Sequence, residues 1–182
     1  MESNLKPFIR YNLDVLFVGL NPPRQSNSNG HYFSGKQSRF FHLLYKSGLI
    51  TIDIEKSTAD QKIFGDTVFN FNGKNYGVVD LVPDKVETNS GKVKPTSEHL
   101  SNLIDKITKY TPMIICVIHS KVRDAFNKSK DPRIIGKLTY GNSGYLLKNC
   151  QTLFFLNYFP NGNNVPDPPK IKIFNEIKLL LS

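Results

Sequence analysis

The sequence predicts an α/β fold of three layers, in which helices cover both faces of a mostly parallel sheet. Four apolar runs have the length of buried strands, and stretches with helical spacing separate or follow them. Strands that alternate with helices form parallel sheets, because each helix returns the chain to the same edge. The chain has 182 residues, of which 39% are hydrophobic. We therefore expect one core and a single domain over residues 1–182.

Each expected strand is a short run rich in Val, Ile, Leu or Phe. The first run stops at Asn21-Pro22-Pro23, where proline prevents the strand from continuing. The four predicted strands are Asp14–Leu20, Tyr76–Val82, Met113–Ile118 and Thr152–Leu156.

Two of the predicted helices, Ser38–Ser47 and Ser97–Thr108, carry apolar residues at helical spacing, which places these residues on one face. The first of them is followed by Gly48, a residue that commonly ends a helix. The second has Glu98 in its first turn, where a carboxylate interacts favourably with the helix dipole. The four predicted helices are Ser38–Ser47, Ser97–Thr108, Lys121–Lys128 and Lys170–Leu181.

The net charge of +9 makes a polyanion the first partner to consider. Nucleic acid is favoured over a membrane, because apolar stretches such as Pro112–Ile118 are far too short to span a bilayer. The first seven residues lack the apolar core of a signal peptide. We expect a cytoplasmic, nucleoid-associated protein in a bacterium and a nuclear one in a eukaryote.

The chemistry of a metal or a nucleotide cofactor is not expected. The two cysteines, Cys116 and Cys150, lie in or near apolar runs, and the four histidines are scattered. They supply neither a disulfide framework nor a four-ligand metal site. No glycine-rich loop of the dinucleotide or P-loop type is present in the sequence.

Three loops are expected to meet at the carboxyl edge of the sheet, where ligands bind in parallel α/β folds. They are Asn21–Gly35, the segment that begins His119-Ser120-Lys121, and Asn157–Pro169. The residues Asn157 to Asn164 are rich in Asn, Gly and aromatic side chains, which offer amides and a stacking ring at a surface. An ordinary connecting loop is the alternative, because Asn-Gly is a common turn signal.

The loop after the first strand carries an ordered set of motifs. The set comprises Gly19-Leu20-Asn21-Pro22, Gly30-His31-Tyr32-Phe33, Ser38-Arg39-Phe40-Phe41 and Ser47-Gly48-Leu49. It resembles the first motif region of the mismatch-specific uracil/thymine DNA glycosylases, which belong to the uracil-DNA glycosylase superfamily. Weaker similarity continues through Tyr76–Val82 and Ser120-Lys121. The resemblance implies a central four-stranded parallel sheet flanked by helices.

The resemblance also implies roles for residues of the first loop. Asn21 falls where the family uses an Asn to hold the attacking water, and Phe33 falls where an aromatic ring stacks on the extruded base. Backbone groups around Leu20 and Phe33 correspond to those that bind the pyrimidine edge, and Ser26 lies in the segment that lines the pocket. The alternatives are an ordinary turn residue for Asn21 and core packing for Phe33.

Contacts with DNA are expected from the last loop and from basic or polar residues near the sheet edge. For His31 the alternative is a satisfied loop histidine, and for Arg39 a structural hydrogen bond. The candidate DNA-binding residues are His31, Arg39, Lys121, Asn157, Asn161, Gly162, Asn163 and Asn164.

The sequence departs from the family pattern at several positions. Pro23 replaces a glycine, Lys36 and Ser38 replace a proline and an asparagine, and Val79 replaces a threonine. The last loop lacks the Asn-Pro-Ser or His-Pro-Ser order of the second motif. The water-activating Asp and the leaving-group His of related glycosylases are not evident from the sequence.

Together these observations predict a monomeric, monofunctional DNA glycosylase without metal or cofactor. It would flip uracil, mismatched thymine or another damaged base out of double-stranded DNA and hydrolyse its N-glycosidic bond in base excision repair. Asn21 cannot titrate, but it can orient the attacking water. Two alternatives stay open. One is a glycosylase-like protein that binds DNA or another protein without cleavage, and the other is a nucleotide-handling α/β enzyme of another kind.

Overall fold

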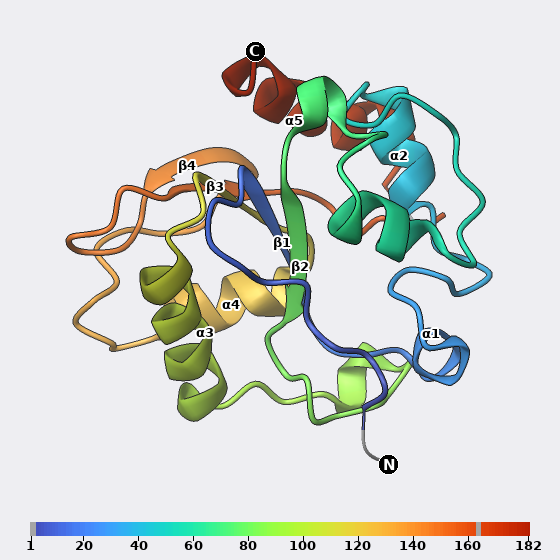
Figure 1. The fold of residues 1–182 in the computed structure, drawn as a ribbon. Helices are drawn as coiled ribbons and strands as arrows, with labels where there is room; N and C mark the ends of the chain where they lie inside the picture. Colours follow the sequence, from blue (N-terminus) through green and yellow to red (C-terminus); the bar gives the residue numbers. More distant parts are fainter. Residues whose placement is uncertain (1–2, 163–164) are drawn as a thin grey trace.

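The structure, a computed structural model, describes residues 3–162 and 165–182 and is built on one central sheet (Figure 1). The strands lie in the order β2-β1-β3-β5-β4, and all pairs are parallel except β4 with β5. The strands are β1 (Val15–Gly19), β2 (Tyr76–Asp80), β3 (Ile114–Val117), β4 (Gly141–Tyr145) and β5 (Leu153–Leu156).

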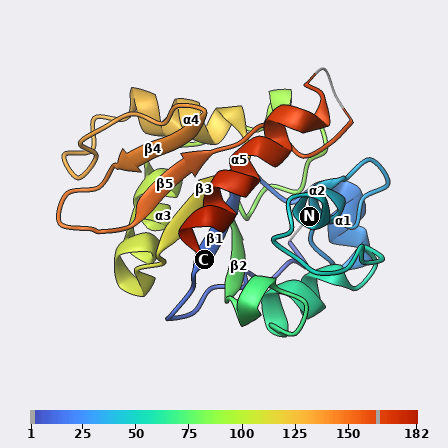
Figure 2. The same ribbon diagram turned by 90° about the horizontal axis from the view of Figure 1, so that it is seen from above.

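Helices cover both faces of the sheet, so the predicted three-layer α/β class is confirmed (Figure 2). The helices α2 and α5 pack on one face and α3 and α4 on the other. The helices are α1 (Arg24–Asn29), α2 (Phe40–Lys46), α3 (Ser97–Tyr110), α4 (Ser120–Lys128) and α5 (Asp167–Leu180). Short helical turns add Gln61–Gly65, Phe71–Gly73 and Ser90–Lys92.

The sheet has one strand more than the four-stranded parallel sheet that the sequence predicts. This strand, β4, has the sequence Gly-Asn-Ser-Gly-Tyr and contains no buried residue. It lies at the edge, pairs antiparallel with β5, and its register shifts between Asn142 and Gly144. A strand that buries neither face shows no apolar pattern, which is why the sequence did not reveal it.

Two apolar clusters, one on each face of the sheet, hold the layers together. The cluster under α2 and α5 is rich in aromatic rings, and Phe17 of β1 makes edge-to-face contacts with Phe40, Tyr76 and Phe174. The cluster under α3 and α4 is mainly aliphatic. Each fully buried Val, Leu, Ile or Phe side chain stabilises the fold by about 1.5–3 kcal/mol relative to an exposed one. The core therefore fixes the position of β1, from which the candidate site begins.

The edge strand β2 is covered by the N-terminal segment at Gly77. Phe8 pairs with Val78 through two backbone hydrogen bonds of 3.0 Å. A Cβ atom on Gly77 would overlap the carbonyl oxygen of Phe8 and the side chain of Leu13. Only glycine allows the two backbones to approach this closely.

We predict that Gly77→Ala lowers the free energy of unfolding by about 1–3 kcal/mol, because the backbone of Phe8 must move to admit the methyl group. Urea unfolding of the two proteins measures the difference. Gly65→Ala is the matched control, since its Cβ would meet only Phe8 Cε1 at 4.0 Å. Equal stability of the Gly77 variant and the wild type would contradict this account of the edge.

Candidate active site at the carboxyl edge of the sheet

The loops that follow β1, β2, β3 and β5 leave the same edge of the sheet and are joined there by backbone hydrogen bonds. The amides of Leu81 and Val82 donate to the carbonyls of Gly19 (3.0 Å) and Leu20 (2.8 Å). The amide of Asn157 donates to the carbonyl of Val117 at 2.8 Å. The three predicted loops therefore meet as expected for a parallel sheet.

Asn21 lies in the turn that directly follows β1, and its side-chain amide is held in one orientation. Its Nδ2 group donates to the carbonyls of Lys85 at 2.8 Å and Glu87 at 2.7 Å. In the part of the chain that the structure describes, its Oδ1 atom accepts no hydrogen bond. The amide therefore presents its acceptor, which can hold a water molecule.

The loop from Ser26 to Phe33 folds back on itself through α1 and Gly30. Ser26 is buried, and its carbonyl accepts a hydrogen bond from the amide of His31 at 3.2 Å. Leu20, at the end of β1, is also buried and belongs to the aliphatic cluster. Both residues are thus buried, Leu20 directly before the turn and Ser26 within α1.

Asp60 fixes the segment His31-Tyr32-Phe33. One carboxylate oxygen lies 2.9 Å from His31 Nδ1, and the other accepts from the amide of Tyr32 at 2.8 Å. Asp60 is buried, at 2% exposure. Sequence reasoning missed Asp60 because nothing local connects it with residues 29 positions earlier. The pairing gives His31 Nδ1 a partner within the protein.

Phe33 has a left-handed backbone with φ of 57°. Such a conformation costs a residue other than glycine about 1–3 kcal/mol and is concentrated at functional sites. One face of its ring stacks on Phe40, with centroids 3.9 Å apart. The side chain is partly exposed, so it can offer stacking surface to a planar ligand.

Asp80, the last residue of β2, is a carboxylic acid at this edge that the sequence analysis did not identify. It lies opposite Gly19 in the register of β1 and β2, and a Cβ atom on Gly19 would overlap Asp80 Oδ1. Its Oδ2 atom is buried without a hydrogen-bond partner among the described residues. Burial raises the pKa of Asp80 to about 7. The sequence contained one signal that could have identified it, because Asp80 is the single charged residue in the apolar run Tyr76–Val82.

Tyr32, in the loop that carries Phe33, is buried within range of the charges of Asp80 and Asp60. Burial, together with the charges of Asp80 and Asp60, raises the pKa of the Tyr32 hydroxyl. The hydroxyl is therefore neutral and can only donate or accept hydrogen bonds.

His119 lies at the end of β3 and caps α4. Its Nδ1 atom accepts a hydrogen bond from the amide of Lys121 at 3.1 Å, which leaves Nε2 to carry the proton. Burial and the charge of Lys121 lower the pKa of His119 to about 4. Its ring makes an edge contact with Phe159 of the last loop, with centroids 5.2 Å apart. The imidazole is thus neutral at physiological pH.

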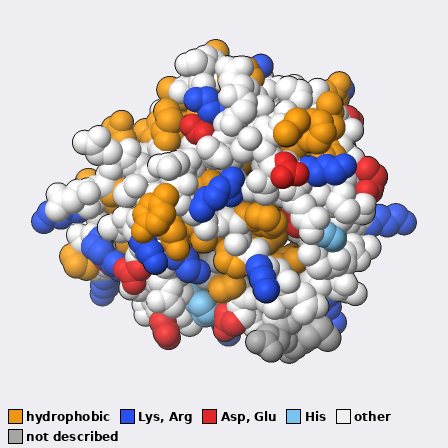
Figure 3. Space-filling model, viewed as in Figure 1, with side chains coloured by type: hydrophobic (Ala, Val, Ile, Leu, Met, Phe, Trp, Pro, Cys, Tyr) orange, Lys and Arg blue, Asp and Glu red, His pale blue; other side chains and the backbone are white. Residues whose placement is uncertain are grey.

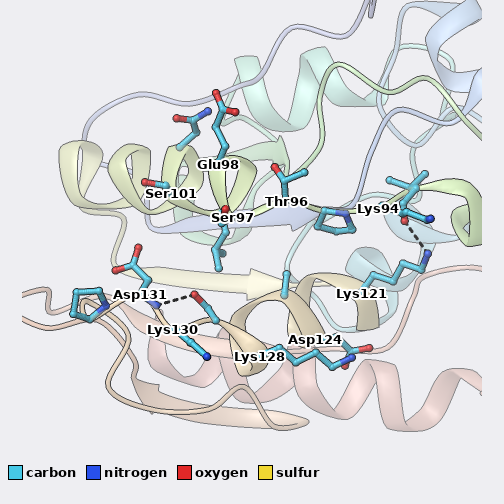
Figure 4. Close-up of a pocket in the computed structure, with 17 residues that line it drawn as sticks. Lys94, Thr96, Ser97, Glu98, Ser101, Lys121, Asp124, Lys128, Lys130 and Asp131 are labelled. Atoms are coloured by element: carbon cyan, nitrogen blue, oxygen red, sulfur yellow. Dashed lines mark hydrogen bonds between the residues drawn. The ribbon is translucent and has the colours of Figure 1, made fainter.

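Lys121 uses its amine inside the protein. Its Nζ donates to the carbonyls of Ser90 and Val93 and so ties the segment after β2 to α4. Figure 4 marks the hydrogen bond to the Val93 carbonyl beside a groove between α3 and α4. The groove has a volume of about 1090 Å³ and lies on the sheet face opposite α2. It is separate from the turn that holds Asn21.

The described part of the last loop is tied to the loop that carries Arg39. The amide of Arg39 donates to the carbonyl of Pro160 at 2.9 Å, and its guanidinium pairs with Asp167. The amine of Lys170, which is fully buried, donates to the carbonyl of Asn161 at 2.7 Å. Burial lowers the pKa of Lys170. Asn161 Oδ1 is buried, without a partner in residues 3–162 or 165–182.

The predicted DNA-binding residues of this loop differ in their surroundings. Asn157 is 1% exposed and donates through Nδ2 to the carbonyl of Lys170 at 3.0 Å. Its Oδ1 atom accepts from the amide of Tyr158 at 2.8 Å, so its amide supports the loop from inside. Gly162 is exposed. Asn163 and Asn164 lie outside the described residues.

The sheet edge thus carries an oriented amide and a buried carboxyl group, and the loop after β1 adds an aromatic residue with a left-handed backbone. The sequence model of the uracil DNA glycosylase superfamily matches residues 7–161, which include every one of these groups. The chain belongs to the uracil DNA glycosylase superfamily. Members of this superfamily are typically DNA glycosylases that hydrolyse N-glycosidic bonds.

We predict that Asn157→Ala lowers the free energy of unfolding by about 1–3 kcal/mol, because the amide of Tyr158 and the carbonyl of Lys170 lose buried partners. Urea unfolding measures the loss. Asn175→Ala, an exposed position on α5, is the control and should change stability little. A stability as high as that of the wild type would show that the buried amide does not support the loop.

Proposed function

We propose that this protein is a monomeric DNA glycosylase of the mismatch-specific type, which releases uracil from double-stranded DNA. The observation that carries the proposal is the orientation of Asn21, whose Nδ2 group is bound by two loop carbonyls while Oδ1 stays available. An amide held in this way can position a water molecule for attack on the sugar without losing entropy at the moment of reaction.

A base inside a duplex must leave the stack before its glycosidic bond can be reached, at a cost of a few kcal/mol. Mismatched bases cost less to extrude, which favours uracil or thymine opposite guanine. Stacking of the extruded base on Phe33 would return about 1–3 kcal/mol. The ring of Phe33 is already supported from behind by Phe40, so it needs little reorganisation to bind a base.

Cleavage of the bond between C1′ and N1 gives the sugar oxocarbenium character and leaves negative charge on the pyrimidine. Backbone amides near Leu20 and Phe33 are fixed by the sheet edge and by the loop around Asp60, respectively. Fixed donors can stabilise the departing base without reorganisation.

The charge of the protein supports binding to DNA. The formal net charge is +9, and Figure 3 shows Lys and Arg side chains spread over the face that it presents, with acidic and apolar groups between them. Affinity should therefore fall as the salt concentration rises. No helix in residues 3–162 or 165–182 has the length and apolar character needed to cross a bilayer.

The direct test is base release from duplexes that contain G·U, A·U, G·T or hypoxanthine, followed by alkaline cleavage of the abasic product. We expect product from the uracil duplexes, with the G·U pair cleaved fastest. The proposal would be abandoned if folded protein in excess released no base from any of them. Salt-sensitive DNA binding without release would instead identify a binding protein with a glycosylase fold.

We predict that Asn21→Ala reduces single-turnover uracil release by at least about 10²-fold, because the attacking water is no longer held in place. DNA binding, measured by fluorescence anisotropy, should change little. Asn102→Ala, an exposed position on α3, is the matched control and should match the wild type. Full activity of the Asn21 variant would exclude the water-positioning role.

A further inference from the structure

We propose that Asp80 is the general base of this site and accepts a proton from the water molecule that Asn21 positions. The inference rests on the proposed glycosylase function and adds to it a group that can take up a proton. Asn21 cannot do so, because an amide does not titrate in water.

The backbone places the Asp80 carboxyl beside the turn that holds Asn21. Asp80 and Gly19 are paired across β1 and β2, and Asn21 follows Gly19 by two residues. The carboxyl occupies the space that a side chain at position 19 would fill. The missing Cβ of Gly19 therefore leaves room for the acid at the end of β1, two residues before Asn21.

The carboxyl group has no internal partner that would give it a structural purpose. Its Oδ2 atom is enclosed and makes no hydrogen bond with any described residue. Leaving a buried polar group unpaired costs about 1–3 kcal/mol, and a charged group costs more. Such groups are concentrated at functional sites, where the unpaired atom serves a ligand or a reacting proton.

The charged neighbours of Asp80 do not neutralise it. On the side of the first loop, the charge of Asp80 contributes to the raised pKa of Tyr32. Asp60 accepts a hydrogen bond from the amide of Tyr32. On the side of α3, a cavity of about 310 Å³ is lined by Asp80 together with Asp84, Glu98, His99 and Lys106. None of these side chains forms an ion pair or hydrogen bond with the Asp80 carboxyl, and His99 pairs with Asp84 instead.

The pKa of Asp80 suits a general base. Burial raises the pKa of Asp80 to about 7, and a general base is most effective when its pKa lies near the working pH. An ordinary Asp, with a pKa of about 3.9, would be ionised at neutral pH but would be a much weaker base.

The reaction can then be written with its atoms balanced. The water oxygen forms a bond to C1′ of the deoxyribose, and the bond between C1′ and N1 breaks. The electron pair of that bond leaves with the pyrimidine as an N1 anion, which takes a proton from solvent. One water proton passes to the carboxylate of Asp80, which returns it to solvent after the product has left.

The pH dependence of the rate distinguishes a base from an acid at this position. A general base must be ionised, so single-turnover uracil release should rise about tenfold per pH unit below pH 7 and level off above it. If the protonated carboxyl instead donated a hydrogen bond to the base, the rate would fall through the same range.

The test compares single-turnover profiles of the wild type, Asp80→Asn and Asp66→Asn from pH 5 to pH 9 on a G·U duplex. We expect Asp80→Asn to be slower by at least about 10²-fold at pH 8 and to lose the rise with pH. Asp66→Asn changes an exposed acid and should keep the wild-type profile. A falling limb in the wild type, or an unchanged profile for Asp80→Asn, would overturn the assignment.

Urea unfolding separates a catalytic loss from misfolding. The folded pKa of Asp80 is raised above its unfolded value, so between about pH 4 and pH 7 the folded state binds more protons and stability falls as pH rises. Asp80→Asn removes this penalty and should unfold at a higher urea concentration than the wild type at pH 8. An inactive variant that also unfolds more easily would assign Asp80 a structural role and overturn the proposal.

The two proposals fail in different ways. If the wild type releases no base from any duplex, the glycosylase function fails and the assignment of Asp80 falls with it. If the wild type releases uracil and Asp80→Asn does so equally well, only the assignment of Asp80 is overturned.

Discussion

The parallel pairing of β1 with both β2 and β3 is the constraint on which the rest of the molecule depends. It aligns Val18 with Val79 and Val117, so the three chains leave the sheet at the same level. Aromatic packing around Phe17 holds β1 from one side, and an aliphatic layer holds it from the other. The turn that follows β1 therefore starts from a rigid position, as preorganised chemistry requires.

Two buried polar atoms without partners among the described residues belong to segments at that same edge. They are Asp80 Oδ2, at the end of β2, and Asn161 Oδ1, in the loop after β5. A third such atom, Asn70 Oδ1, lies before β2 and away from this edge. The buried carboxylate of Asp60 is by contrast fully used, because it accepts from the amides of Tyr32 and Gln61 and contacts His31. An unpartnered acid beside the proposed water site is therefore a feature that packing alone does not require.

The sequence predicted the four parallel strands because each is largely buried on both faces and is therefore rich in apolar residues, whereas β4 contains no buried residue and shows no apolar pattern. Asn21 and Phe33 were found from an ordered set of motifs. Asp80 and Asp60 were missed because their roles depend on neighbours that are distant in the sequence. Lys170 was predicted as the first residue of a helix, and in the structure its side chain is fully buried. Burial is rare for lysine and requires a partner, which here is the Asn161 carbonyl.

The support of the last loop by α5 bears on where the folding unit ends. The superfamily match stops at residue 161, but the amine that holds the Asn161 carbonyl comes from Lys170, and Phe174 of the same helix packs edge-to-face on Phe17. A chain that ended at residue 161 would keep every matched residue but would lose α5, which contributes Phe174 to the aromatic cluster. In this protein the boundary of sequence similarity and the boundary of cooperative folding are therefore different places.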